Sequence, residues 1–331
     1  MSIGNPYEFL RERYLMLRPS LEWDPSDPTW QDRARAALVD AVGVVDEPWP
    51  VAGLEVLSEE PLDRHVRQRV VFPSRDGWSG RGWLLIPEQA EMPSPAVVCL
   101  PGHGRGADTI VGLVDEPYQS EFALQCVREG WVALAVEQPS FGTNQSSRDG
   151  EKGSSCSMDS LFGLVLGETM TGWRARDAIA AYRALCTHPA VDPTRIATMG
   201  ISGGGLTALW SAALEPGIFG ACVSGYFCPM AHSILLFDHC PDNYVPGFAR
   251  LMDIPDLAGL IAPRPLAVEN GTEDPIFAAE GFRLACNYAR DIYKSVGATS
   301  QFECELFQGD HVFHGTNMLR HLREKFGGGG R

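Results

Sequence analysis

A serine flanked by glycines is the strongest chemical signal in the sequence. Ser202 lies in Gly200-Ile201-Ser202-Gly203-Gly204, between an apolar, β-prone stretch (195–199) and a stretch with helical spacing (204–214). A G-x-S-x-G pattern between a strand and a helix is typical of a nucleophile elbow, a tight turn that presents the serine hydroxyl. The helix start also offers N–H groups to a developing oxyanion. The sequence therefore predicts a nucleophilic Ser202, with a plain glycine-rich turn as the alternative.

A nucleophilic serine needs a base, and the base needs an orienting acid. Asp274 follows the apolar stretch 265–269 and lies 274 − 202 = 72 residues after Ser202. His311 follows the stretch 302–306 and lies 311 − 274 = 37 residues further on. Loops that leave the carboxyl ends of parallel strands meet at one edge of a sheet. We therefore expect Asp274 as the acid and His311 as the base.

Each of these two assignments has a rival close by in the chain. Glu273 adjoins Asp274 and is an alternative acid. His314 is an alternative to His311, although it is expected to open the last helix.

A glycine-rich turn supplies a candidate for the oxyanion-binding site. Pro101-Gly102-His103-Gly104-Arg105-Gly106 follows the apolar stretch 96–100, and its glycines allow the backbone to turn sharply towards the serine. We expect the backbone amides of His103 and Gly203 to bind the oxyanion, with the His103 imidazole taking no direct part. A phosphate-binding loop is the competing interpretation, but the turn satisfies neither G-x-x-x-x-G-K-[ST] nor G-x-G-x-x-G.

A metal site is a second chemistry to consider, and its candidate ligands are His232, Asp238, His239 and Cys240. Two of these are adjacent in the chain, and their spacing matches no familiar metal motif. We therefore expect no metal.

Strand-like and helix-like stretches alternate through most of the chain, which predicts an α/β fold. Strands are expected at 54–57, 66–72, 82–86, 96–100, 131–136, 195–199, 220–224, 265–269 and 302–306. Helices are expected at 121–128, 172–186, 204–214, 278–296 and 314–325. This alternation predicts a mostly parallel central sheet with helices on both faces, within a main domain at 51–326.

Other parts of the chain depart from this alternation. Residues 1–50 are expected to form an N-terminal helical extension, with helices at 6–17 and 28–41, packed on the main domain or on a partner subunit. Segments 138–168 and 225–255 are long, follow expected strands, and are expected to form a cap over the site. The last residues, 327–331, are expected to be a flexible tail. Four aromatic residues are candidates either for the pocket lining or for the core of the cap: Tyr226, Phe227, Phe237 and Tyr244.

Charge and composition exclude several classes of protein. The 331 residues include 42 Asp and Glu against 27 Lys and Arg, a formal charge of −15. This acidity argues against nucleic-acid and anionic-membrane partners, which need clustered Lys and Arg. No apolar run approaches the ~20 residues that span a bilayer, and charges at positions 8 and 11–13 interrupt any secretory leader. Nine dispersed cysteines without a C-x-x-C pair favour reduced thiols and a cytoplasmic protein.

The sequence resembles the serine α/β-hydrolases, nearest to their acetyl xylan esterase-like and dienelactone hydrolase-like branch. The resemblance spans roughly residues 65–320 and rests on VVCLPGHGRG, VEQPSFG, GISGGG, CPDNYVPG, LIAPRPLAVENGTEDPIF and QGDHVF. It implies an α/β-hydrolase fold with an eight-stranded sheet, an acyl-enzyme on Ser202 and no cofactor. The chain departs from dienelactone hydrolases, whose nucleophile is usually cysteine. The interrupted leader also weighs against a polymeric xylan substrate.

The expected function is therefore hydrolysis of a carboxylic ester of a small molecule by the triad Ser202, Asp274 and His311. Hydrolysis of a C–C bond or an amide by the same triad is the alternative enzymatic function. A catalytically silent binding module on the same fold is the alternative outside enzymes. The N-terminal extension is also compatible with a homo-oligomer.

Overall fold

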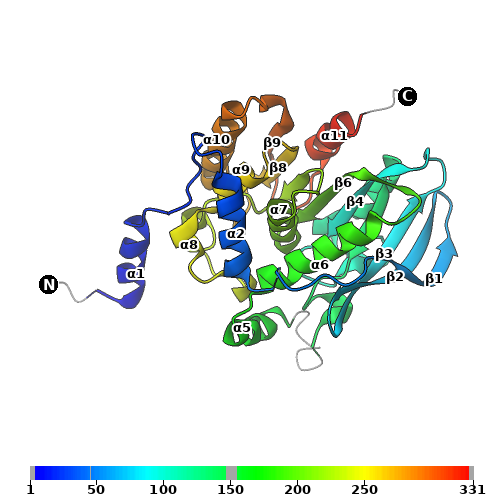
Figure 1. Ribbon diagram of the computed structural model, residues 1–331, viewed down its shortest axis with the longest axis horizontal. Helices are drawn as coiled ribbons and strands as arrows, with labels where there is room; N and C mark the ends of the chain where they lie inside the picture. The colour runs from blue at the N-terminus through cyan, green and yellow to red at the C-terminus, as the bar shows by residue number, and fades with distance from the viewer. Residues whose placement is uncertain (1–3, 45, 147–154, 328–331) are drawn as a thin grey trace.

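Nine strands form one sheet in the computed structural model, which describes residues 4–44, 46–146 and 155–327 (Figure 1). The strands are β1 (Glu55–Pro61), β2 (His65–Arg75), β3 (Trp78–Pro87), β4 (Ser94–Leu100), β5 (Val132–Val136), β6 (Val191–Ile201), β7 (Ala221–Ser224), β8 (Leu266–Gly271) and β9 (Phe302–Phe307). Their order across the sheet is β1-β2-β3-β5-β4-β6-β7-β8-β9. Strands from β1 to β5 in this order pair antiparallel, and those from β5 to β9 pair parallel. The expected mostly parallel sheet is confirmed.

The sheet has one strand more than the eight that the resemblance implies. Strand β1 lies at the edge beside β2, and all seven of its residues are exposed. Backbone pairing and exposed polar pairs hold it there, including the ion pair between Glu60 and Arg67. The eight-strand expectation is therefore wrong at this edge, where a strand forms without burying an apolar face.

Helices cover both faces of the sheet, as expected. They are α1 (Pro6–Leu15), α2 (Trp30–Val42), α3 (Ala107–Ile110), α4 (Phe122–Arg128), α5 (Cys156–Leu166), α6 (Met170–Leu185), α7 (Gly203–Leu214), α8 (Phe248–Leu251), α9 (Leu257–Ile261), α10 (Ala279–Ser295) and α11 (Thr316–Lys325). One core joins the sheet to α2, α6, α7, α9 and α10, and a second joins its other face to α3, α4 and α11. Among the described helices, none has both the length and the apolar character needed to cross a bilayer.

Helix α7 lies at the centre of the first core. All twelve of its residues are buried, which explains why its sequence is apolar on every side rather than amphipathic. Helix α11 begins two residues later than expected, because Gly315 takes a left-handed conformation (φ +75°) just before it. His314 therefore precedes this helix instead of opening it.

The N-terminal extension contains two helices that differ in their packing. Helix α2 buries Trp30, Ala34, Leu38 and Val42 in the first core. Helix α1 buries none of its residues and stands away from the rest of the molecule (Figure 1).

The two long segments expected to form a cap contain short helices. Segment 138–168 holds a 3-10 turn (Gly142–Asn144) and α5, and its polar stretch 147–154 falls outside the described residues. Segment 225–255 holds α8 and turns of 3-10 helix at Met230–His232 and Pro241–Asn243. The expected tail at 327–331 lies almost wholly outside the described residues.

Candidate active site

Ser202 occupies a sharp turn between β6 and α7, with the predicted strand and helix on either side. Its φ of +56° is a left-handed value that a non-glycine residue rarely adopts. Its N–H donates to the Ser224 carbonyl at 2.9 Å, which anchors the turn to β7. A Cβ on Gly204 would lie 1.9 Å from the Leu100 carbonyl oxygen at the end of β4. Glycine is therefore required for α7 to start so close to the neighbouring strand.

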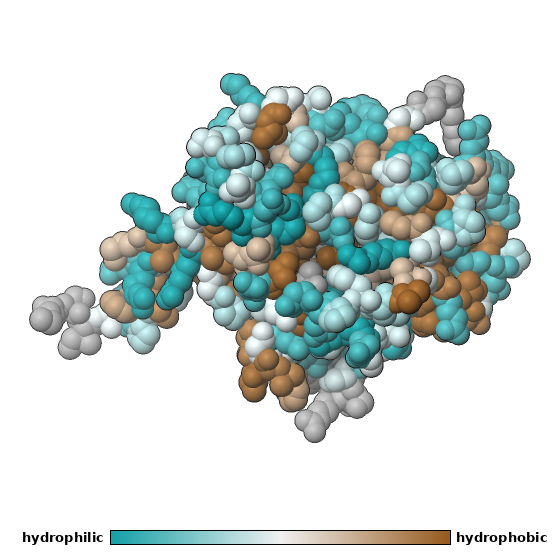
Figure 2. All heavy atoms as spheres, viewed as in Figure 1, coloured by the Kyte–Doolittle hydropathy of each residue, from teal (hydrophilic) through white to brown (hydrophobic). Residues whose placement is uncertain are grey.

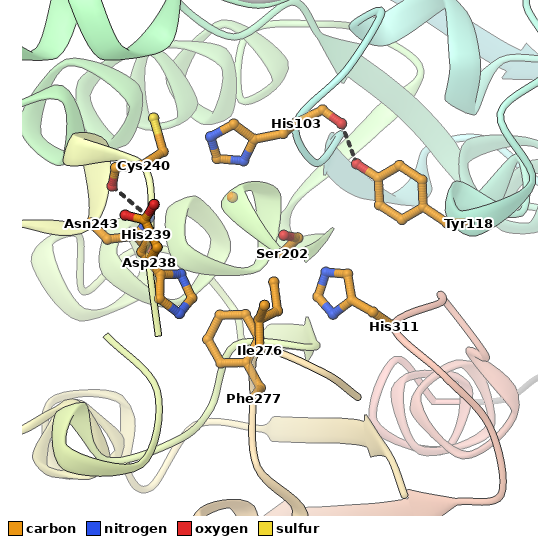
Figure 3. A pocket seen from close by; sticks show the side chains of 11 residues that line it. His103, Tyr118, Ser202, Asp238, His239, Cys240, Asn243, Ile276, Phe277 and His311 are labelled. Carbon is orange, nitrogen blue, oxygen red and sulfur yellow. Dashed lines mark hydrogen bonds between the residues drawn. The ribbon is translucent and has the colours of Figure 1, made fainter. Parts of the chain in front are cut away.

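Asp274 and His311 form a hydrogen-bonded pair beside this turn. The His311 Nδ1 lies 2.6 Å from Asp274 Oδ2. The other carboxylate oxygen accepts from the N–H groups of Ile276 and Phe277, at 3.0 and 2.9 Å, so the buried aspartate is fixed from two sides. The buried His311 Nε2 has no hydrogen-bond partner among the described residues, and the imidazole faces Ser202 (Figure 3). The structure thus brings the three residues together: Ser202 and His311 line one cavity, and the buried Asp274 holds His311.

The two rival residues point elsewhere. Glu273 is exposed and accepts a hydrogen bond from the Gln308 side chain at 2.6 Å. His314 is also exposed, and it stacks on Phe307 with its Nδ1 3.4 Å from Glu305. Neither contributes to the cavity wall at Ser202.

The end of strand β7 positions the imidazole in a way that sequence reasoning missed. Gly225 has a φ of +55°, and a Cβ there would lie 2.8 Å from Cε1 and 3.0 Å from Nδ1 of His311. The backbone of Gly225 therefore forms a wall against which the His311 ring packs.

The cavity at Ser202 has a volume of about 340 Å³. Its lining comprises His103, Tyr118, Ser202, Gly203, Asp238, His239, Cys240, Asn243, Ile276, Phe277 and His311 (Figure 3). Tyr118 and Phe277 hold the His311 ring between them, with ring centroids 6.2 and 5.8 Å away and nearly parallel planes. Segment 225–255 supplies Asp238, His239, Cys240 and Asn243 to the wall.

The aromatic residues of the lining are not those singled out from the sequence. Tyr226 and Phe227 are buried in the first core. Phe237 and Tyr244 are partly exposed and lie outside the cavity lining. Tyr118 lies in a 3-10 turn (Pro117–Gln119), and Phe277 follows Asp274 in the loop after β8.

The glycine-rich turn after β4 lies at the same cavity. The Gly102 N–H donates to the buried Gln119 side chain at 2.8 Å, and the Tyr118 hydroxyl donates to the His103 carbonyl. A Cβ on Gly203 would lie 2.9 Å from His103 Nδ1, so the two expected oxyanion donors belong to adjoining residues. The His103 imidazole itself lines the cavity, which sequence reasoning did not foresee.

The His103 imidazole lies beside a buried ion pair. His103 Nε2 lies 3.0 Å from Asp242 Oδ2, and the same oxygen accepts from the Arg174 guanidinium. Burial disfavours the charged imidazole, but the Asp242 carboxylate outweighs it and raises the pKa of His103 to about 9. Burial also disfavours the carboxylate, but His103 and Arg174 together hold the pKa of Asp242 below its ordinary value. The cavity therefore has a cationic side chain next to Ser202.

Sequence reasoning missed Asp242 and Arg174. The available signal was the charge within α6, where Arg174 is buried together with Arg176 and Asp177, since charged residues are almost never fully buried unless they are paired.

The residues considered as metal ligands are not brought together. Asp238, His239 and Cys240 line the cavity, whereas His232 packs against Gly281 of α10. Within the described part of the chain, a different group has ligand atoms within 4.8 Å of one another: His103, Cys156, Cys240 and Asp242.

The mostly parallel sheet, the serine at a strand-to-helix elbow and the buried Asp–His pair define an α/β-hydrolase with a serine-hydrolase site. The chain belongs to the Abhydrolase family, whose family model matches residues 26–288.

Known proteins of similar sequence and structure agree with this class. The Bacillus subtilis (strain 168) protein YtaP, named as a hydrolase, is 25% identical over 304 residues, covering 88% of this chain and 97% of that protein. A Bacteroides fragilis NCTC 9343 structure described as an acetyl xylan esterase has a TM-score of 0.83 at 17% identity, covering 98% of this chain and 96% of that one. A glucuronoyl esterase from Solibacter usitatus has a TM-score of 0.67 at 17% identity, with 95% and 98% covered. The TM-scores show that the two solved structures share the fold of this chain, and at identities this low the likeness establishes the fold alone.

Proposed function

We propose that the protein hydrolyses carboxylic esters through an acyl-enzyme on Ser202. The observation that carries the proposal is the fixed Asp274–His311 pair, whose free Nε2 faces a serine held at a left-handed φ. A serine, an oriented imidazole and a buried carboxylate in this arrangement are the components of nucleophilic acyl transfer.

The proposed reaction has two steps. His311 takes the proton of Ser202 as the serine oxygen attacks the ester carbonyl, and the amides of His103 and Gly203 bind the oxyanion. When the tetrahedral intermediate collapses, His311 gives that proton to the departing alcohol. It then takes a proton from water, which attacks the acyl group and releases the acid, and the proton returns to Ser202. Asp274 keeps the imidazole in the required tautomer and stabilises its charged form.

We propose small, polar esters as the substrates. The cavity of about 340 Å³ suits a short acyl group, and Asp238, His239 and Asn243 offer polar partners for the alcohol part. Names among the structural neighbours support this proposal, since the Bacteroides fragilis protein is described as an acetyl xylan esterase and the Solibacter usitatus protein as a glucuronoyl esterase. Acetylated monosaccharides should be cleaved faster than long-chain acyl esters at equal concentration.

Labelling with a fluorophosphonate tests the nucleophile. The wild-type protein should gain one adduct, and a peptide map should place it on Ser202. Ser202→Ala should remove both the adduct and the turnover of p-nitrophenyl acetate, by upwards of ~10⁴-fold in rate. Ser224→Ala is the matched control, because Ser224 holds Ser202 through its backbone carbonyl. An adduct on any other residue would contradict the proposal.

A further inference from the structure

Two cysteines from the two cap segments meet at the wall of the catalytic cavity. Cys156 is the first residue of α5, and Cys240 immediately precedes the 3-10 turn at Pro241–Asn243. Their Sγ atoms lie 2.8 Å apart, although the residues are 240 − 156 = 84 positions apart in the chain. Cys240 is partly exposed and lines the cavity beside His103 (Figure 3), whereas Cys156 is buried.

The surroundings of the pair favour a thiolate on Cys240. The hydrogen bond between the two sulfurs lowers the pKa of Cys240. The guanidinium of Arg174 donates to the Cys156 sulfur at 3.2 Å and places a positive charge beside that sulfur. A thiolate that small molecules can reach, next to a second thiol, is the arrangement in which cysteines oxidise to a disulfide.

A metal ion is the other occupant that these residues suggest, because His103, Cys156, Cys240 and Asp242 have ligand atoms within 4.8 Å of one another. Two features favour oxidation instead. The buried Arg174 already donates to both Asp242 and Cys156, so a fixed cation neutralises two of the four groups. Two sulfurs on one zinc ion lie roughly 3.7 Å apart in a tetrahedral site, well beyond the separation here.

We propose that Cys156 and Cys240 are the site of a reversible disulfide that ties segment 138–168 to segment 225–255 at the catalytic cavity. With hydrogen peroxide as oxidant, the Cys240 thiolate attacks one peroxide oxygen and becomes a sulfenic acid, releasing the first water once a proton is taken up. Cys156 then attacks the Cys240 sulfur and the second water leaves. Two thiols thus lose two hydrogens and two electrons, and one peroxide becomes two waters. A dithiol reductant reverses the link by exchange.

The chain contains two further thiol pairs that serve as internal comparisons. Cys99 and Cys126 lie in the second core with sulfurs 4.0 Å apart, where an oxidant has no open route. Cys304 and Cys286 lie on β9 and α10, far along the chain from the cap segments. A hydrogen bond from Cys286 lowers the pKa of Cys304 to about 7, helped by the guanidinium of Arg290. This last pair is the competitor that the experiment must separate from Cys156 and Cys240.

Oxidation followed by thiol counting tests the proposal without relying on esterase activity. The fully reduced, folded protein is treated with one equivalent of hydrogen peroxide, then unfolded in guanidinium chloride, alkylated with N-ethylmaleimide so that buried thiols also react, and analysed by intact mass and peptide mapping. Wild type should lose about 2 Da, retain seven of its nine alkylatable cysteines, and yield a cross-linked peptide pair joining Cys156 to Cys240. Dithiothreitol should restore all nine.

Single substitutions make the assignment specific. Cys156→Ser and Cys240→Ser should each abolish the cross-linked peptide, whereas the control Cys304→Ser should leave it unchanged. A cross-link that maps to Cys286 and Cys304, or nine alkylated cysteines after peroxide, would overturn the proposal. Equimolar zinc in the purified protein that disappears in Cys240→Ser would overturn it in favour of a metal site. If a serine variant does not fold, the wild-type peptide map decides between these outcomes.

Discussion

Adjacent acidic residues at the end of β8 have opposite environments. Asp274 is buried and holds His311, whereas Glu273 is exposed and accepts a hydrogen bond from Gln308. We expect Asp274→Asn to lower kcat by roughly 10²–10⁴-fold, because the imidazole loses its tautomer and orientation. Glu273→Gln should cost less than about tenfold. Turnover of p-nitrophenyl acetate by the two variants checks this, and the reverse ranking would show that the acid is misassigned.

Gly225 provides a second test at the scale of one residue. Alanine there would place a Cβ 2.8 Å from the His311 ring and push the imidazole away from Ser202. A displacement of about 1 Å in a catalytic group costs on the order of 10²-fold in rate, so we expect at least that loss in kcat for Gly225→Ala.

Gly247→Ala is the matched control for this effect. Gly247 also has a left-handed φ, at +80°, but a Cβ there would meet nothing within 4 Å. Both variants therefore carry similar backbone strain, and only Gly225→Ala displaces His311. Circular dichroism confirms that each is folded. Equal kcat values for the two would show that the contact with His311 does not matter.

Local sequence identified the residues of the triad because each follows an apolar stretch that ends at the same edge of the sheet. Their positions directly after predicted strands were enough to single out Ser202 and His311. Gly225, Asp242 and Arg174 were missed for a physical reason. Their importance comes from contacts with residues far away in the chain, such as Arg174 with Asp242, 68 positions apart. No local pattern records such a contact.

At the scale of elements, Glu137 links the end of β5 to the turns around the cavity. Its buried carboxyl accepts from the Ala107 N–H and the Thr143 hydroxyl, each at 3.2 Å. Burial raises the pKa of Glu137 from 4.5 to about 7. The folded protein therefore keeps this proton where the unfolded chain has lost it, and the carboxyl's contribution to stability falls as the pH rises through this range.

Removing this ionisation should flatten the pH dependence of stability. The free energy of unfolding of wild type should fall by up to about 3 kcal/mol relative to Glu137→Gln between pH 4.5 and about 7. Urea unfolding of both proteins at a series of pH values measures this difference. A constant difference would mean that folding does not shift the pKa of Glu137, and a wild-type stability that rises with pH relative to Glu137→Gln would mean that folding lowers it.

The regular elements were predictable and the cap was not. Apolar stretches such as 96–100 and 131–136 match β4 and β5 to within two residues, since a strand buried on both faces must be continuously apolar. The segments 138–168 and 225–255 carry no such period. Their short helices are positioned by tertiary contacts, including the buried Asp242 beneath Arg174, so their conformation could not be derived from the sequence.

At the scale of the whole molecule, the N-terminal extension consists of two parts that pack differently. The indole of Trp30 donates to the Glu22 carbonyl and packs edge-on against Trp23. Gln31 donates to the carbonyls of Gly259 and Ala262 at 2.7 Å, which joins α2 to α9. The chain from about residue 20 onward is therefore part of the hydrolase core. Because the sequences of α1 and α2 both have helical periodicity, the pattern could not show that only α2 packs into this core.

Helix α1 meets the body through few contacts. The Tyr14 hydroxyl donates to Asp253 at 3.3 Å and Tyr7 to the Leu235 carbonyl at 3.4 Å, while Phe9 and Met16 remain 60% and 70% exposed. Figure 2 also shows apolar side chains gathered over α5.

A helix held so weakly opens by itself, without unfolding of the rest. Its arginines, Arg11 and Arg13, are the sites at which trypsin should cut first, because the next arginine, Arg18, is followed by Pro19 and that bond resists trypsin. We expect brief digestion at low protein concentration to leave a stable product beginning at residue 14 or 12 with undiminished turnover of p-nitrophenyl acetate; mass spectrometry identifies the cut. First cleavage elsewhere would contradict this. Cleavage that slows as the protein is concentrated would show that a second copy of the protein covers α1. The rate of proteolysis would then report whether the protein self-associates.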